Sequence, residues 1–185
     1  MYNVPNLITF LRLGLVPILA YCVISGAYAA ATTIFLIAAL SDLADGYIAR
    51  RFKLVSRLGA LLDPIADKLN MLVTTVLLGW QDLLPIWLAI AIVARDIAIV
   101  LGVLIYRFGG RHLKMKPTRL SKANTFLEFS VLVLVLASAA HWIELNAWLP
   151  LLFLIVLGTV IASTVQYAWL WSRGELALRR RSGGP

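Results

Sequence analysis

Long apolar stretches separated by short polar connections make up most of this chain. Six of them are close to 20 residues long, about the length that an α-helix needs to cross the hydrocarbon core of a bilayer. The expected helices cover residues 7–25, 29–50, 59–79, 84–106, 122–140 and 147–172. Pro5 precedes the first of them, in a position that suits the start of a helix. The pattern predicts an all-α integral membrane protein whose six transmembrane helices form a single domain over residues 1–185.

The composition excludes most classes of soluble protein. Of the 185 residues, 61% are hydrophobic and 14% are charged, whereas soluble domains have about 45–50% and about 25%. An ordinary water-soluble enzyme, a disordered tail and a fibrous protein are therefore excluded. The single cysteine, Cys22, cannot form an internal disulfide. Residues 1–6 contain no positively charged segment and no cleavage pattern follows, so we expect neither a secretory nor a mitochondrial targeting peptide.

Positive charge is concentrated in alternate connections. Seventeen Lys and Arg against nine Asp and Glu give a net charge of +8, which in so apolar a chain indicates a membrane surface, and we expect no nucleic-acid partner. The connections around Gly26, Gln81 and His141 contain no Lys or Arg, whereas cations gather within 50–57, 107–122 and 173–181. The positive-inside rule therefore places both termini in the cytoplasm, including a basic tail over 173–185. Without a presequence, a bacterial inner membrane is the simplest expectation.

Four aspartates fall within or at the ends of the second and third predicted spans. They are Asp42 and Asp45, spaced i, i+3, and Asp63 and Asp67, spaced i, i+4, so that each pair shares one helix face. A carboxylate inside a bilayer is costly and is a functional candidate by default. The short connection makes the two helices antiparallel neighbours, so both pairs lie near the same membrane surface. Such oxygen ligands suit Mg²⁺, Mn²⁺ or Ca²⁺, and two ions about 3.5–4 Å apart would form a clamp for phosphoryl chemistry.

Two other classes also use intramembrane acids. A small cation transporter would place them near the bilayer midplane, often on broken helices, whereas these acids cluster toward the cytoplasmic ends. A polyprenyl transferase uses aspartates with Mg²⁺ but favours other spacings. The small residues Gly46, Ala49 and Gly59 lie beside the acids and leave room for a bulky ligand or another backbone. We therefore favour an enzyme whose substrate arrives from the cytoplasm.

The runs DLADGYIAR at 42–50 and GALLDPIAD at 59–67 match every fixed position of the signature of the CDP-alcohol phosphotransferases, and the chain resembles that family throughout its length. The resemblance implies a six-helix membrane enzyme, commonly a homodimer, that transfers a phosphatidyl or similar group from a CDP-linked donor to an alcohol and releases CMP. It implies two Mg²⁺ or Mn²⁺ ions per site. Their expected ligands are Asp42, Asp45, Asp63 and Asp67, of which Asp63 and Asp67 are catalytic and Asp67 is the general base.

The resemblance also implies where the donor binds. The expected donor contacts are the signature residues Asp42, Asp45, Gly46, Ala49, Arg50 and Gly59. At the start of the first predicted helix, Asn6, Thr9 and Arg12 recur at i, i+3 and i+6, roughly on one face. We expect Asn6 and Thr9 to meet the diphosphate of the donor.

Segments outside the signature bear on the acceptor alcohol. Arg95-Asp96 and the segment KPTRLSKANT at 116–125 resemble the CMP-forming cardiolipin synthases of this family, whereas its phosphatidylglycerophosphate synthases tend to carry Lys in place of Asn124. An amide suits phosphatidylglycerol, which has one phosphate charge, better than the dianion glycerol 3-phosphate. The resemblance thus implies CDP-diacylglycerol as donor and phosphatidylglycerol as acceptor, with glycerol 3-phosphate as the alternative acceptor. The expected acceptor contacts are Arg95, Lys116, Arg119, Lys122, Asn124 and Arg173.

One residue departs from the pattern of the cardiolipin synthases. Glu128 stands where they usually carry Gln. An acid within a transmembrane span needs a partner, and we expect Lys122 or Arg95 to provide it.

Overall fold

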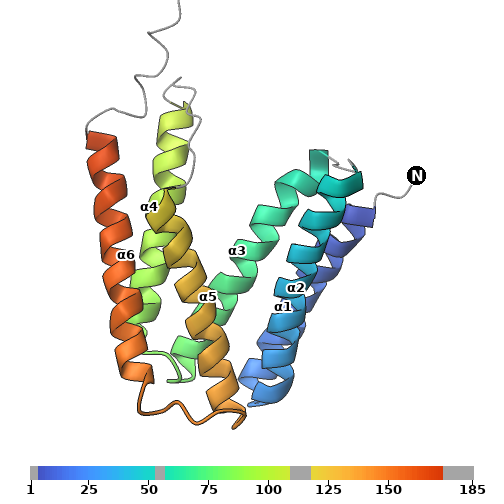
Figure 1. Ribbon diagram of the computed structural model, residues 1–185, viewed down its shortest axis with the longest axis vertical. Helices are drawn as coiled ribbons and strands as arrows, with labels where there is room; N and C mark the ends of the chain where they lie inside the picture. Colours follow the sequence, from blue (N-terminus) through green and yellow to red (C-terminus); the bar gives the residue numbers. More distant parts are fainter. Residues whose placement is uncertain (1–3, 53–56, 109–117, 173–185) are drawn as a thin grey trace, which may run out of the picture. The chain divides into compact units, whose positions relative to one another are not determined.

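The computed structural model describes residues 4–52, 57–108 and 118–172, with side chains described over 11–41, 68–102 and 118–170. All regular structure in these ranges is helical (Figure 1). The helices are α1 (Val4–Ile24), α2 (Tyr28–Phe52), α3 (Arg57–Trp80), α4 (Ile86–Phe108), α5 (Arg119–Ala139) and α6 (Leu149–Ser172). Every helix begins and ends within about three residues of its predicted bounds, because the length of each apolar run sets the length of its helix. The all-α class and the positions of the helices are therefore confirmed.

The helix ends have local causes in the sequence. Gly26, Asp82 and His141, which follow α1, α3 and α5, have positive φ angles of 75°, 56° and 58°. In each case, the N–H groups of that residue and of the next one donate to carbonyls three and five residues earlier. This pair of hydrogen bonds satisfies carbonyl groups in the last turn, and the helix ends there. At the start of α5, the hydroxyl oxygen of Thr118 accepts from the backbone N–H of Ser121 at 3.1 Å, as a helix N-cap does.

The first compact unit consists of residues 1–86 and 132–149. In it, α1 packs against α2 and α3. Leu19, Phe35 and Leu78 have no exposed surface, so each of these three helices contributes a fully buried side chain to the core. At one end of the unit, Nε2 of Gln81 donates to the backbone oxygens of Val23 and Ile24 at 3.4 and 3.3 Å. This side chain ties the end of α3 to the final turn of α1.

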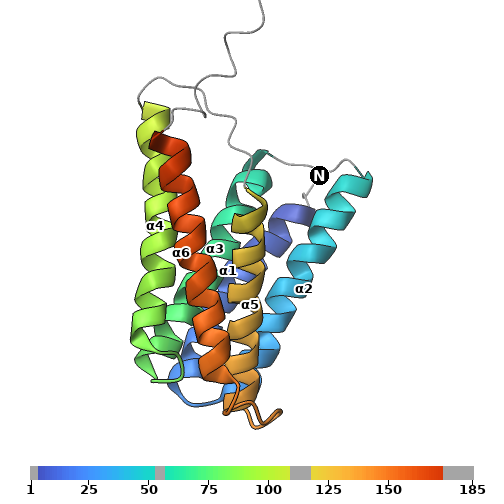
Figure 2. The same ribbon diagram turned by 60° about the vertical axis from the view of Figure 1, so that its left-hand side comes forward.

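The second compact unit consists of residues 87–131 and 150–185. Its described helices are α4, the first part of α5, and α6, which lie side by side in Figures 1 and 2. α5 contributes residues to both units. A single domain over residues 1–185 stays a prediction.

Apolar surface on the helices bears on the membrane assignment. Within the described ranges, Arg119–Ala139 and Leu149–Leu170 are long and apolar enough to cross a bilayer by length and composition. Two shorter apolar helical segments, Leu11–Ile24 and Tyr28–Ser41, accompany them. α6 exposes more than half of the side-chain surface of Leu154, Ile161 and Val165. A large apolar outer surface suits lipid better than water.

Candidate active site

The two aspartate pairs lie on consecutive helices of the first unit. Asp42 and Asp45 belong to α2, and Asp63 and Asp67 belong to α3. Asp45 lies seven residues before the end of α2 and Asp63 six residues after the start of α3, which at about 1.5 Å per residue is about 10 Å from either helix end. Figure 1 shows α2 and α3 running in opposite directions. The pairs therefore occupy the same end of this helix pair.

The backbone keeps each aspartate pair on one face of its helix, and the assignment of the four aspartates as metal ligands stays a prediction. α2 is continuous through Asp42 and Asp45, and α3 is continuous through Asp63 and Asp67. The i, i+3 and i, i+4 spacings therefore keep each pair on one face of its helix. The four side chains lie outside the described residues. Among the side chains that are described, no group of three or more His, Cys, Asp or Glu could hold a metal ion. Four carboxylates on two rigid helices are a donor set that fits Mg²⁺ or Mn²⁺.

The predicted donor-binding residues belong to the same end of the first unit. Asn6 and Thr9 lie in the first turns of α1, whereas Gly46, Ala49 and Arg50 lie near the end of α2 and Gly59 near the start of α3. Their side chains are also outside the described set. One turn beyond Thr9, Arg12 is described and is 2% exposed. A buried guanidinium at this point of α1 favours an anionic neighbour, because an uncompensated buried charge is strongly unfavourable.

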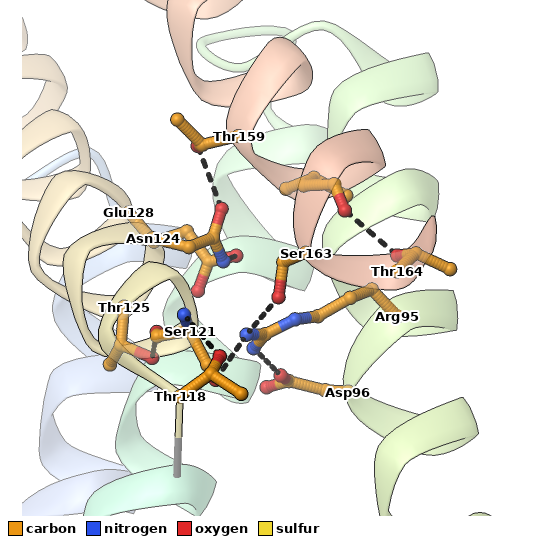
Figure 3. A network of polar contacts seen from close by, with 11 residues as sticks. Arg95, Asp96, Thr118, Ser121, Asn124, Thr125, Glu128, Thr159, Ser163 and Thr164 are labelled. Atoms are coloured by element: carbon orange, nitrogen blue, oxygen red, sulfur yellow. Dashed lines mark hydrogen bonds and ion pairs between the residues drawn. The ribbon is translucent and has the colours of Figure 1, made fainter. Parts of the chain in front are cut away.

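Arg95 is the centre of a hydrogen-bond network in the second unit (Figure 3). It lies in the middle of α4 and is 3% exposed. Its Nη1 donates to Oδ1 of Asp96 at 2.8 Å. Its Nη2 donates to the hydroxyl oxygens of Ser121 in α5 and Ser163 in α6, at 2.8 and 3.1 Å. One cation thus links three helices, and charge-assisted bonds of this kind are stronger than neutral ones.

Asn124 forms a second set of hydrogen bonds, which involves α5 and α6. It is fully buried. Its Nδ2 donates to Oε1 of Glu128 at 2.6 Å, and its Oδ1 accepts from the hydroxyl of Thr159 at 2.8 Å. Both polar atoms of the amide are therefore engaged by protein groups. Glu128, which is 1% exposed, has an amide partner where we expected Lys122 or Arg95; Lys122 is exposed on α5.

The structure does not bring all predicted acceptor residues together. Arg95 and Asn124 lie in the buried network shown in Figure 3. Arg119 and Lys122 are exposed in the first turn of α5. Lys116 and Arg173 fall outside the described residues. The acceptor assignments of these residues stay predictions.

Sequence reasoning missed the hydroxyl groups that hold this network. Ser121, Thr159 and Ser163 resemble ordinary small residues of a tightly packed helix bundle. A usable signal existed in α6, where Thr159 and Ser163 are spaced i, i+4 in an apolar run and so share a face. The interhelical partners of Ser121, Thr159 and Ser163 lie 26 to 68 positions away in the chain, and no local pattern identifies them.

Comparison with known proteins supports the assignment made from the signature. A model of the CDP-alcohol phosphatidyltransferase family matches residues 2–171. The chain belongs to this family. Family membership confirms the resemblance that the two runs at 42–50 and 59–67 predicted.

Individual relatives of the CDP-alcohol phosphatidyltransferase family cover much of this chain. A cardiolipin synthase (CMP-forming)/mitochondrial hydrolase fusion protein of Schizosaccharomyces pombe is 37% identical over 181 residues, which are 90% of this chain and 30% of that protein. The human cardiolipin synthase (CMP-forming) is 31% identical over 182 residues, 90% of this chain and 60% of the relative. A CDP-diacylglycerol–glycerol-3-phosphate 3-phosphatidyltransferase of Bacillus subtilis is 35% identical over 114 residues, 54% of this chain and 59% of the relative. The chain thus spans less than two thirds of each of these proteins.

Proposed function

We propose that this chain is a CMP-forming cardiolipin synthase, which transfers a phosphatidyl group from CDP-diacylglycerol to phosphatidylglycerol and releases CMP. The observation that carries the proposal is the placement of both aspartate pairs at one end of α2 and α3. In a chain of this family, that placement supplies carboxylates that can hold the metal ions used in phosphoryl transfer. Relatives that are themselves cardiolipin synthases match 90% of the chain.

Each aspartate has a proposed task. Asp42, Asp45, Asp63 and Asp67 would hold two Mg²⁺ or Mn²⁺ ions, which when bound neutralise charge on the diphosphate and on departing CMP. Asp67 takes the proton of the acceptor hydroxyl while that oxygen forms a bond to the β-phosphorus of the donor. The bond from this phosphorus to the oxygen of CMP breaks at the same time, so the electron pair leaves with CMP.

The donor and acceptor would approach along different helices. Asn6, Thr9, Gly46, Ala49, Arg50 and Gly59 would hold the CDP group on α1, α2 and α3. On the acceptor side, Arg95 provides a buried positive charge, and we assign Lys116, Arg119, Lys122 and Arg173 to the approach of the lipid phosphate. Both polar atoms of Asn124 bond to Glu128 and Thr159. We therefore propose that Asn124 influences the choice of acceptor because it is uncharged, and not through a direct bond to the lipid phosphate.

A second candidate function is transfer to glycerol 3-phosphate. The Bacillus subtilis relative carries the name of such an enzyme, and the same aspartates would perform the same chemistry. The two candidates differ only in the acceptor.

The membrane arrangement is also part of the proposal. We propose that all six helices cross the membrane, that both termini and the active site face the cytoplasm, and that the enzyme is a homodimer in a bacterial inner membrane. The segregation of cations to alternate connections supports this orientation.

Release of CMP tests the proposed function. Purified full-length protein in detergent with Mn²⁺ receives CDP-diacylglycerol and phosphatidylglycerol, and products are identified by mass spectrometry. We expect CMP and cardiolipin in equal amounts, and no release when phosphatidylglycerol is omitted. Phosphatidylglycerophosphate formed from glycerol 3-phosphate, without cardiolipin synthesis, would favour the second candidate. In the same protein reconstituted into lipid vesicles, a Mn²⁺ flux without CMP release would instead support a transporter.

A further inference from the structure

The way in which Arg95 is held leaves one of its donors unused. Its Nη1 and Nη2 make three hydrogen bonds, to Asp96, Ser121 and Ser163. Its Nε is buried and has no hydrogen-bond partner among the residues that the structure describes. A buried donor without an acceptor is unfavourable by about 1–3 kcal/mol. Such a donor on a cation that is 3% exposed is suited to an anionic oxygen brought by a ligand.

The two serines fix the direction of this donor. Both hydroxyl oxygens accept from the same nitrogen, Nη2, and they come from different helices, α5 and α6. Because a guanidinium is planar and rigid, fixing Nη2 between two helices and Nη1 against Asp96 also fixes where Nε points. Ser163 has no exposed surface and Ser121 has 9%, so water has little access to compete for these bonds.

We propose that Ser121 and Ser163 are positioning residues that orient the Arg95 guanidinium so that its Nε meets a phosphate oxygen of the acceptor. This inference rests on the proposed function, because it takes Arg95 to be part of the acceptor site. The serines themselves touch no substrate. They act by holding one orientation of Arg95, which otherwise has several rotamers within reach.

A second link between the same helices separates this role from a merely structural one. The hydroxyl of Thr159 donates to Oδ1 of Asn124, one helical turn from Ser163 and three residues from Ser121. α5 and α6 therefore remain tied when a serine hydroxyl is removed. Loss of that hydroxyl should change acceptor binding while the helices stay in place.

Steady-state kinetics of serine variants test the proposal in the full-length protein. The variants are Ser121→Ala and Ser163→Ala, and Ser121→Thr restores a hydroxyl at the less buried site. The control is Thr164→Val, since the Thr164 hydroxyl donates to the carbonyl of Val160 in its own helix at 2.8 Å. CMP release is measured with saturating CDP-diacylglycerol and varied phosphatidylglycerol.

The expected result is a KM for phosphatidylglycerol raised about 3- to 20-fold in each alanine variant, the range that one interhelical hydrogen bond in a membrane protein accounts for. We expect kcat and the donor KM to change less than about twofold, and Ser121→Thr to restore the acceptor KM. Equal losses in kcat for the alanine variants and for Thr164→Val would show a structural role and overturn the proposal. An unchanged acceptor KM would overturn it as well.

Failure of the proposed function gives a different result. If the native protein uses only glycerol 3-phosphate, the acceptor assignment is wrong, and the same selective rise in KM for glycerol 3-phosphate would still support the role of the serines. A readout independent of turnover is the thermal shift that short-chain phosphatidylglycerol, or glycerol 3-phosphate, produces. The alanine variants should need about 3- to 20-fold more of the ligand that shifts the native protein. Identical titrations of native and variant protein with both ligands would contradict the proposal.

Discussion

Replacing Asn124 by Leu removes both buried hydrogen bonds of its side chain and keeps the branching and the number of non-hydrogen atoms. The bond to Oε1 of Glu128 measures 2.6 Å, and a hydrogen bond to a charged group contributes about 1.5–3 kcal/mol in soluble proteins. Interhelical polar contacts in membrane proteins average about 0.6 and reach about 1.7 kcal/mol. Thr159 loses little, because its hydroxyl also contacts the carbonyl of Val156 at 2.9 Å. We therefore expect the free energy of unfolding to fall by about 1–3 kcal/mol, mainly from loss of the bond to Glu128.

Reversible unfolding in mixed detergent and dodecyl sulfate micelles measures this change. The matched control is Thr125→Val, one residue away, because the Thr125 hydroxyl donates to the carbonyl of Ser121 in its own helix at 3.1 Å. An Asn124→Leu variant as stable as Thr125→Val would refute the reasoning.

Three further predictions concern catalysis, the choice of acceptor and the packing of α1 against α3. Asp67→Asn should abolish CMP release yet retain binding of CDP-diacylglycerol in a thermal-shift titration, since an amide cannot take the proton; undiminished turnover would exclude Asp67 as the base. Asn124→Lys should lower kcat/KM for phosphatidylglycerol relative to glycerol 3-phosphate, because it adds a cation at the acceptor side; an unchanged ratio would show that position 124 does not select the acceptor. Gln81→Leu should lower the free energy of unfolding by about 1 kcal/mol or less, because its bonds to the backbone oxygens of Val23 and Ile24 are long; a loss above about 2 kcal/mol would mean that this link does more than cap α1.

The sequence predicted the helices well because apolar length and backbone stop signals are local properties. The end of α1 at Gly26 is an example, since a glycine favours the positive φ found there. Asp82 and His141 adopt the same conformation at the ends of α3 and α5 without being glycine. These two ends were nevertheless located within a few residues from the ends of the apolar runs.

The polar partners inside the second unit could not be derived in the same way. Glu128 was expected to pair with a cation, because charge balance is the simplest rule for an acid in an apolar helix. The structure shows a hydrogen bond to Glu128 from the amide of Asn124, one turn earlier on the same face of α5, which charge balance alone does not predict. Arg95 likewise has Ser121 and Ser163 as partners, and these depend on how three helices pack. Periodicity within one helix carries no information on that packing.

Competition between the two acceptors tests the central claim most directly. The full-length protein in lipid nanodiscs with Mn²⁺ and CDP-diacylglycerol receives isotopically distinct phosphatidylglycerol and glycerol 3-phosphate together, and mass spectrometry identifies the phosphatidyl products. The account predicts that labelled cardiolipin accumulates with CMP and that phosphatidylglycerophosphate does not. Accumulation of phosphatidylglycerophosphate without cardiolipin would contradict the proposed function.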